Sequence, residues 1–300
     1  MYVELLTAVI PVFLVAGVGY VLRRVSGSDL RGLHLLAYYV AGPAMVFTAL
    51  FHADLSGDSI GRIAAFTALA YVVLWGVGWA AGFMSNWPAE KRRAAALSLG
   101  STNCANYGLP IIGFAFGEAG VVIGTVFVVM HIVVHVGLGG TYASWLTDTR
   151  IGTQLKRIFS IPYIYAAGLG LGLRAIVGEI PVPIAESLDL LGRMWIPLLI
   201  LLLGAEMASI SSLRQIREAL VLTGLKLLIA PAAGLLLAAL LGLTGLERSV
   251  LILQASMPTA VNGLLFARQF ETRPDLVATV LLLTTLGSLA ILPLLLSVVH

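Results

Sequence analysis

Amide and hydroxyl side chains occur in two otherwise apolar stretches of the chain, where they could bind an anion without carrying charge themselves. The two stretches read Ser101-Thr-Asn-Cys-Ala-Asn-Tyr-Gly-Leu-Pro110 and Ser256-Met-Pro-Thr-Ala-Val-Asn-Gly263. Such side chains donate hydrogen bonds to a carboxylate, and a neutral donor lets a bound anion leave again. We expect contacts to a substrate from Thr102, Asn103, Asn106, Thr259 and Asn262. The alternative is that these side chains only satisfy backbone groups freed by interrupted helices.

Proline and glycine in the same stretches predict two helices that are interrupted inside a membrane. Proline removes a backbone hydrogen bond and hydrocarbon offers no replacement, so such backbone persists only inside protein or beside water. Helix-break or crossover positions are predicted at Gly108, Pro110, Pro258 and Gly263. The helical segment after a break begins with free N–H groups and the positive end of its dipole, which suits a carboxylate. We place the first such segment after Pro110. Paired interruptions in two halves of a chain are typical of a transporter's binding site.

His131 and His135 lie one turn apart in the predicted span 119–146, so they share one helix face near the middle of the membrane. We expect His131 to contact substrate and His135 to have a charge or proton role. The alternative is a pair of neutral imidazoles hydrogen-bonded to neighbouring helices. The spacing also resembles part of a zinc site. No Glu follows His131 and no third ligand is evident, however, so we expect no metal and no cofactor.

Lys226 lies well inside the predicted span 214–242, where an ammonium must face protein, a partner or a cavity. A cation there favours anionic cargo and gives Lys226 a charge or proton role. The alternative is that it bonds carbonyls loosened by Pro231 or extends toward the headgroups. Arg193, four residues before Pro197, is the other basic residue within a predicted span. For Arg193 the alternative to a charge role is that it anchors a scaffold or a subunit contact.

Acidic residues do not occur near the middle of any predicted span. Glu4, Glu186, Glu206 and Glu247 all fall near span ends, where solvent can reach them. A buried carboxylate is the usual proton or sodium relay in inverted-repeat exchangers. Three options for coupling therefore stay open: facilitated movement along the membrane potential, proton coupling through histidine, or sodium held by amides and carbonyls at the two breaks.

Composition excludes a soluble domain. Hydrophobic residues make up 59% of the 300 residues and charged residues 11%, against roughly half and roughly a quarter in soluble domains. With about 20 residues per crossing, the chain predicts ten membrane spans joined by short loops. They are 3–22, 30–52, 60–84, 94–116, 119–146, 160–178, 183–206, 214–242, 250–270 and 275–298. Membrane lipid is therefore the expected surroundings, and we expect no nucleic-acid partner despite the net charge of +3.

Basic residues are concentrated in alternate loops. One set comprises Arg23, Arg24, Arg31, Lys91, Arg92, Arg93, Arg150, Lys156, Arg157, Arg214, Arg217, Arg268 and Arg273, and the other only Arg62, Arg174 and Arg248. We expect a multi-pass protein of the cell (inner) membrane. The positive-inside bias places the first set of basic residues in the cytoplasm and both chain ends on the outer side. No small-residue cleavage site precedes the first basic loop, so we expect no cleavable signal peptide. The single Cys104 cannot form an internal disulfide.

Five spans in each half is an odd number, so two halves of one fold must lie in opposite orientations. We expect a first repeat over 1–146, a cytoplasmic linker over 147–159 and a second, inverted repeat over 160–300. Pro43 and Pro197 are separated by almost the same number of residues as Pro110 and Gly263, which supports duplication. The alternative is chance similarity, because proline and glycine are common in membrane helices.

The two polar stretches resemble motifs of the auxin efflux carrier family, which includes plant PIN-type carriers and PIN-like bacterial permeases for organic acids. Asn103-Cys-Ala-Asn-Tyr-Gly-Leu-Pro-Ile-Ile112 is similar to the family's fourth-span motif, and Met257-Pro-Thr-Ala-Val-Asn-Gly-Leu-Leu-Phe-Ala-Arg268 to its ninth. The resemblance covers essentially the whole chain. It departs in the ninth span, where Gly263 takes the place of the crossing proline and Pro258 comes earlier, and in the short central loop.

The resemblance implies an all-α membrane protein with a 5+5 inverted repeat, similar to bile-acid/sodium symporter-like and NhaA-like architecture. Spans 1, 2, 6 and 7 would form a scaffold, often a homodimer interface. Spans 3–5 and 8–10 would form a mobile transport domain in which broken spans 4 and 9 cross. His131 matches the polar residue of the fifth span that faces substrate in this family.

Three classes of function follow. The leading hypothesis is a secondary carrier, not an enzyme, that moves a small organic anion by elevator-type alternating access, with a proton or sodium as the candidate coupling ion. The alternatives are an intramembrane enzyme, for which the His131/His135 pair would be the only nucleus, and a membrane sensor without flux.

Overall fold

A computed structural model of the chain describes residues 2–27, 30–53, 55–139, 151–210 and 213–299, and over these residues the protein is helical without a β-strand. The end of the predicted span 119–146 and the first residues of the predicted linker 147–159 lie outside the described residues. The remainder of that linker is helical. Apolar residues dominate nearly every helix, as expected for a chain whose surroundings are lipid.

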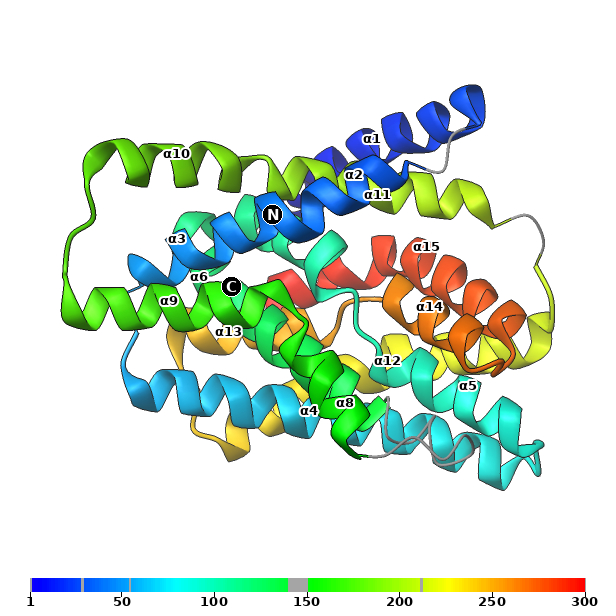
Figure 1. The fold of residues 1–300 in the computed structure, drawn as a ribbon. Helices are drawn as coiled ribbons and strands as arrows, with labels where there is room; N and C mark the ends of the chain where they lie inside the picture. Colours follow the sequence, from blue (N-terminus) through cyan, green and yellow to red (C-terminus); the bar gives the residue numbers. More distant parts are fainter. Residues whose placement is uncertain (1, 28–29, 54, 140–150, 211–212, 300) are drawn as a thin grey trace.

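The helices follow one another with short connections, and three of them are single π-helical turns, labelled η (Figure 1). The first half contains α1 (Tyr2–Ser26), α2 (Arg31–Leu36), η1 (Ala37–Ala41), α3 (Gly42–Phe51), α4 (Gly57–Met84), α5 (Ala89–Gly100), η2 (Cys104–Gly108), α6 (Leu109–Val134) and η3 (His135–Gly139). The second contains α8 (Ile151–Phe159), α9 (Pro162–Ile176), α10 (Val182–Arg193), α11 (Trp195–Ser209), α12 (Ile216–Leu240), α13 (Gly245–Ala255), α14 (Val261–Gln269) and α15 (Pro274–Val299).

Seven helical segments in the described part of the chain are long and apolar enough to cross a membrane. They are Val9–Ser26, Arg31–Phe51, Gly57–Met84, Cys104–Leu138, Val182–Ser209, Ile216–Leu240 and Pro274–Val299. The protein is therefore a multi-span membrane protein. The predicted spans 94–116 and 250–270 are interrupted, and the predicted span 160–178 contains the shorter α9, so none of these three forms a long unbroken helix.

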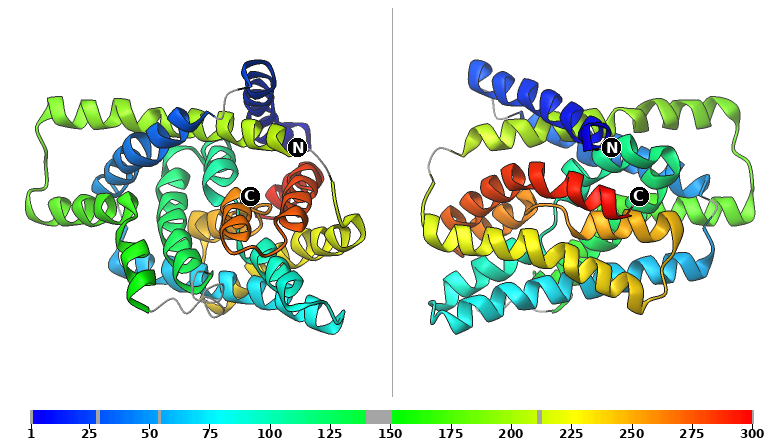
Figure 2. Two further views of the ribbon diagram at one scale, coloured as in Figure 1. Left: turned by 45° about the vertical axis from the view of Figure 1, so that its right-hand side comes forward. Right: turned by 180° about the vertical axis from the view of Figure 1, so that it is seen from behind.

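Two groups of helices pack side by side. In the first group α1 lies along α11, and α3 packs against α9 and α10. In the second group α4 packs against α5 and α6, and α12 against α13 and α15. Figures 1 and 2 show α1, α10 and α11 along one side of the molecule and α4 and α5 along the opposite side, with α13, α14 and α15 between them.

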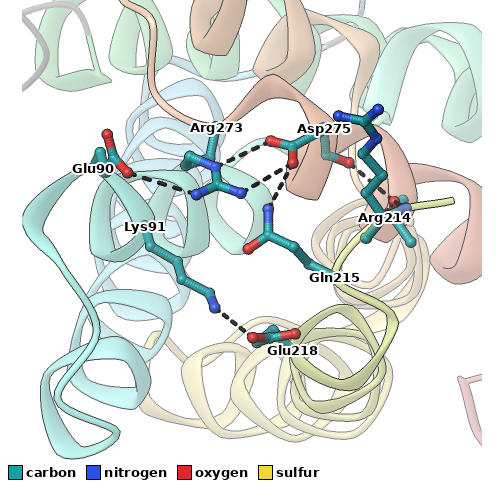
Figure 3. Close-up of polar contacts among 8 residues, drawn as sticks. Glu90, Lys91, Arg214, Gln215, Glu218, Arg273 and Asp275 are labelled. Atoms are coloured by element: carbon teal, nitrogen blue, oxygen red, sulfur yellow. Dashed lines mark hydrogen bonds and ion pairs between the residues drawn. The ribbon is translucent and has the colours of Figure 1, made fainter. Parts of the chain in front are cut away.

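Polar side chains join three helices of the second group at one end (Figure 3). The residues labelled there are Glu90, Lys91, Arg214, Gln215, Glu218, Arg273 and Asp275. Lys91 on α5 pairs with Glu218 on α12. Arg273 contacts Asp275 at 3.1 Å and Glu90 at 3.6 Å, and the hydrogen bond to Asp275 raises the pKa of the Arg273 guanidinium. Three of the loops predicted to be basic on one membrane side therefore meet at the same end of the molecule.

Glycine sets the close approach of α1 and α11. A Cβ built on Gly19 would overlap the carbonyl of Leu201, and a Cβ on Gly204 would overlap the carbonyl of Ala16. Small residues let membrane helices pack backbone to backbone, which gains dispersion energy that lipid cannot supply. A Cβ on Gly17, on the same helix, would meet no atom within 4 Å.

We therefore expect Gly19→Val to destabilise the folded protein, because the added side chain forces α1 away from α11. The cost of such overpacking is about 1–3 kcal/mol. Thermal unfolding of purified protein in detergent measures it, with Gly17→Val as the matched control. Equal unfolding midpoints for the two variants would contradict the packing described here.

Candidate functional site

Two non-helical segments lie against each other in the interior. The first, Ser101–Asn103, follows α5, and the second, Ser256–Ala260, follows α13. They run antiparallel and form an isolated β-bridge between Thr102 and Thr259. The Asn103 N–H donates to the Pro258 carbonyl at 2.8 Å, and the Ala260 N–H donates to the Ser101 carbonyl at 2.9 Å. Each segment thus satisfies backbone groups that the other one frees.

Side chains satisfy the last carbonyls of α5, which have no partner within the helix. The Thr259 hydroxyl donates to the Ser98 carbonyl at 2.7 Å. Lys226 Nζ, fully buried on α12, donates to the Leu99 carbonyl at 2.6 Å and to Thr102 Oγ1 at 3.0 Å. The Thr259 contact corresponds to the structural alternative stated for the threonines above. Lys226 also bonds a carbonyl, but one left by the end of α5 and not one loosened by Pro231.

Of the four predicted break positions, one lies in a non-helical segment and three lie in helical turns that follow the breaks. Pro258 lies within the second non-helical segment, whereas Gly263 lies in the first turn of α14. Gly108 and Pro110 lie within the helical run of η2 and α6, because the first interruption ends at Asn103. The segment with free N–H groups therefore begins at η2, before Pro110.

Both glycines mark close contacts between the two halves. A Cβ on Gly263 would lie 2.8 Å from Ser101 Oγ, and a Cβ on Gly108 would overlap Gln254 Oε1. A larger residue at position 263 would press against Ser101 Oγ and Cβ, whereas at position 108 it would first displace the end of the Gln254 side chain. The glycines therefore serve the packing of the two breaks.

The two histidines stack beside the first break. Their rings are nearly parallel, with centroids 6.1 Å apart. His131 Nε2 accepts a hydrogen bond from the Thr102 N–H at 3.2 Å. His135 Nδ1 lies 3.2 Å from the Tyr71 hydroxyl and 3.4 Å from Ser101 Oγ. His131 thus satisfies a backbone donor of the break, as the structural alternative requires, while its ring also lines the adjoining pocket.

A small pocket, the break pocket, lies beside this bridge and has a volume of about 40 Å³. It is lined by Ser101, Thr102, Asn103, Cys104, Ala105, Asn106, His131, Ile132, His135, Ala260, Val261 and Asn262. Asn103 Nδ2 and His135 Nε2 are buried and have no hydrogen-bond partner in the described part of the protein. Since a water molecule needs about 10–15 Å³ of such volume, the pocket has room for a few waters or for one carboxylate group.

Most of the predicted binding residues therefore lie together. The break pocket is lined by Thr102, Asn103, Asn106, His131, His135 and Asn262. Thr259 is not among its lining residues, and Lys226 lies behind Thr102 with no exposed surface. In the described residues no group of three His, Cys, Asp or Glu side chains is arranged to hold a metal ion.

Two larger cavities continue from the break pocket. The inner cavity, of about 260 Å³, shares Asn106, His135 and Asn262 with the break pocket and has a largely apolar lining that includes Tyr163, Trp195, Leu199, Leu202 and Phe266. The vestibule, of about 580 Å³, shares His34, Glu206, Val261 and Leu265 with the inner cavity. Its other lining residues include Arg23, Arg31, Ser209, Leu264 and Arg268.

Three residues of this region were not predicted as site residues. Tyr71 holds His135 from α4, and Gln254 on α13 is fully buried with Oε1 unpartnered among the described residues. A glutamine within an apolar span was a signal that could have been used. Glu206 was predicted at a helix end open to solvent, but its side chain is only 18% exposed and lines both the inner cavity and the vestibule. The residues facing it come from distant parts of the chain, which no local pattern reveals.

Comparison with known proteins assigns the family. The family model described as membrane transport protein matches residues 4–145 and 147–296. An uncharacterized transporter of Methanothermobacter thermautotrophicus is 27% identical over 297 residues, which cover 95% of each chain. An uncharacterized transporter of Methanocaldococcus jannaschii is 26% identical over 208 residues, which cover 65% of this chain and 64% of the relative. With both halves matched, the chain belongs to this membrane transport family, the auxin efflux carrier family that its two polar stretches resemble.

Proposed function

We propose that the protein is a secondary carrier for a small organic anion and that the break pocket binds the carboxylate of the cargo. The observation that carries this proposal is the pair of buried polar atoms, Asn103 Nδ2 and His135 Nε2, that lack a partner in the described residues and lie in one pocket. Buried polar groups normally have a partner, so such a pair indicates a ligand or water. In the tautomer whose Nδ1 accepts from the Tyr71 hydroxyl, Nε2 of a neutral His135 is a donor, as is the Asn103 amide.

The cavities support a cargo with a polar head and a less polar body. The break pocket has room for one carboxylate. The inner cavity offers about 260 Å³ between aromatic side chains such as Tyr163 and aliphatic ones such as Leu199. Apolar lining with a few placed polar groups is the usual composition of small-molecule sites. Asn106 and Asn262 line both spaces and would contact the cargo where its head meets its body.

We further propose ten spans in a 5+5 inverted repeat. In this assignment α5, η2 and the first part of α6 form the fourth span, and α13 with α14 forms the ninth. Gly117, with φ of 64°, interrupts α6 and divides the fourth span from the fifth. The antiparallel course of the two breaks is what inversion of one repeat onto the other requires.

Movement of one group of helices past the other would carry the site across the membrane. The scaffold in this proposal is the first group, spans 1, 2, 6 and 7, which would also form a homodimer interface. The transport domain is the second group, spans 3–5 and 8–10. A further cavity of about 500 Å³ between α3, α6 and α10 shares no lining residue with the break pocket or the inner cavity. Among the cavities lined by described residues, the site would thus open toward the vestibule, whose side we assign to the cytoplasm, with both chain ends outside.

Lys226 supports a carrier without a sodium requirement. Its ammonium contacts a helix C-terminal carbonyl and a hydroxyl beside the break, which are oxygen ligands that a sodium ion would otherwise need. A tethered cation at this place also offsets part of the charge of a bound anion. The remaining coupling ion is then a proton, or none.

Replacing Asn103 or Asn262 by leucine is expected to abolish uptake of carboxylates into proteoliposomes, because the cargo loses a neutral donor and meets an apolar group. Asn262→Asp should have the same effect through charge repulsion with little change in folding, since Asn262 is exposed to the cavity. Ser297→Leu, on the exposed face of α15, is the control. Wild-type flux in both leucine variants would refute the site.

Wild-type uptake is expected to proceed when choline replaces sodium. Uptake into proteoliposomes is measured with a proton, a sodium and an electrical gradient imposed in turn.

Lys226→Met should lower the thermal midpoint, since an unsatisfied buried carbonyl costs about 1–3 kcal/mol, and should reduce uptake strongly. Lys156→Met, in the loop helix α8, is the control. It shows whether the loss of a positive charge elsewhere in the chain also lowers uptake. Strict dependence of wild-type uptake on sodium would refute the role given to Lys226.

A further inference from the structure

Three arginines from three separate helices line the vestibule. Arg23 comes from the end of α1, Arg31 from the start of α2 and Arg268 from the end of α14. Among the described residues that line this space, Glu206 is the one carboxylate. These lining residues give the described part of the vestibule a basic character, and a concave surface of one sign concentrates ions of the other sign.

Two charged groups of the vestibule have polar atoms without a protein partner. Arg23 Nη1 is buried and has no hydrogen-bond partner in the described residues. Glu206 Oε1 contacts His34 Nε2 at 3.6 Å. Glu206 Oε2 is buried and has no hydrogen-bond donor among the residues that the structure describes. A buried guanidinium N–H without a protein acceptor indicates an acceptor from solution. Guanidinium groups bind carboxylates with charge-assisted hydrogen bonds, often in pairs.

We infer that the vestibule is a second anion site, in which Arg23, Arg31 and Arg268 hold a cargo carboxylate before it reaches the break pocket. The His34–Glu206 pair lies where the vestibule meets the inner cavity and marks the boundary between the two sites. This inference rests on the proposed transport of an organic anion. Guanidinium groups bind carboxylates, so an organic anion with a carboxylate group is the ligand class that fits this site.

The site is also divided between the two groups of helices. Arg23, Arg31, His34 and Glu206 belong to the first group, whereas Arg268 belongs to the second. Elevator movement of the second group would take Arg268 away from the other two arginines. The vestibule would then bind anions in the conformation open to this side and lose affinity in the other one.

The experiment measures stabilisation of the purified protein by malonate, a dianion at neutral pH, in detergent at low ionic strength. A ligand that binds the native state raises the thermal midpoint by mass action. Arg268→Gln is expected to weaken the apparent affinity for malonate by at least about tenfold, the order expected for one charge-assisted hydrogen bond. Arg24→Gln is the matched control. It lies next to Arg23 on α1, but Arg24 is exposed and bonds Tyr20 instead of lining the vestibule.

A second pair of variants separates this site from the break pocket. Asn103→Leu should still be stabilised by malonate, with the same sensitivity to Arg268→Gln, although its uptake is lost. Arg23→Gln repeats the test if Arg268→Gln does not fold. Binding that is sensitive to Arg268 without any flux supports the vestibule and refutes the proposed transport.

Three results overturn the inference while leaving the proposed transport intact. The first is equal malonate affinity in wild type, Arg23→Gln and Arg268→Gln. The second is complete loss of malonate binding in Asn103→Leu, which would leave only one site. The third is arginine-dependent stabilisation by phosphatidylglycerol but not by malonate, which would make this a lipid headgroup site.

Discussion

Two interrupted helices can exist inside a membrane protein only if the backbone groups that they free find partners without water. Here the two interruptions satisfy each other through the Asn103 and Ala260 N–H groups, and side chains complete the carbonyl end of α5. An unsatisfied group in hydrocarbon costs several kcal/mol. The bridge and the side chains around it therefore hold α5, α12 and α13 together, and the pocket beside it depends on this arrangement.

The same requirement decides which polar side chains are free to bind a ligand. Thr259, Thr102, Lys226 and His131 use polar atoms to satisfy the breaks. Asn103 Nδ2 has no such partner among the described residues, although Asn103 is in the same segment. In a low-dielectric interior, a free donor of this kind is costly unless something occupies it. The surplus donors, and not the number of polar residues, therefore support the place proposed for the cargo.

The sequence predicted the two polar stretches, the family and the set of residues that gather in the pocket, because proline, glycine and asparagine together in apolar sequence favour a break in the helix. It did not predict that Thr259 donates to Ser98 or that Lys226 reaches Leu99, since these partners are more than a hundred residues apart. The prediction that Glu206 lies at a solvent-exposed helix end was wrong because the residues that surround it are also distant in the sequence. Local pattern reports burial and helix breaks, whereas hydrogen-bond partners across the fold depend on how the helices pack.

The arrangement of contacts also bears on how such a carrier could move. Ion pairs join α5, α12 and α15 at one end of the second group, and the bridge joins α5 to the α13–α14 connection in its interior. The second group is thus tied together by polar contacts that would survive a displacement as a body. Between the groups lie the vestibule and the inner cavity, whose lining is largely apolar. A displacement that breaks few hydrogen bonds has a low energetic cost, so the boundary between the groups is where alternating access would take place.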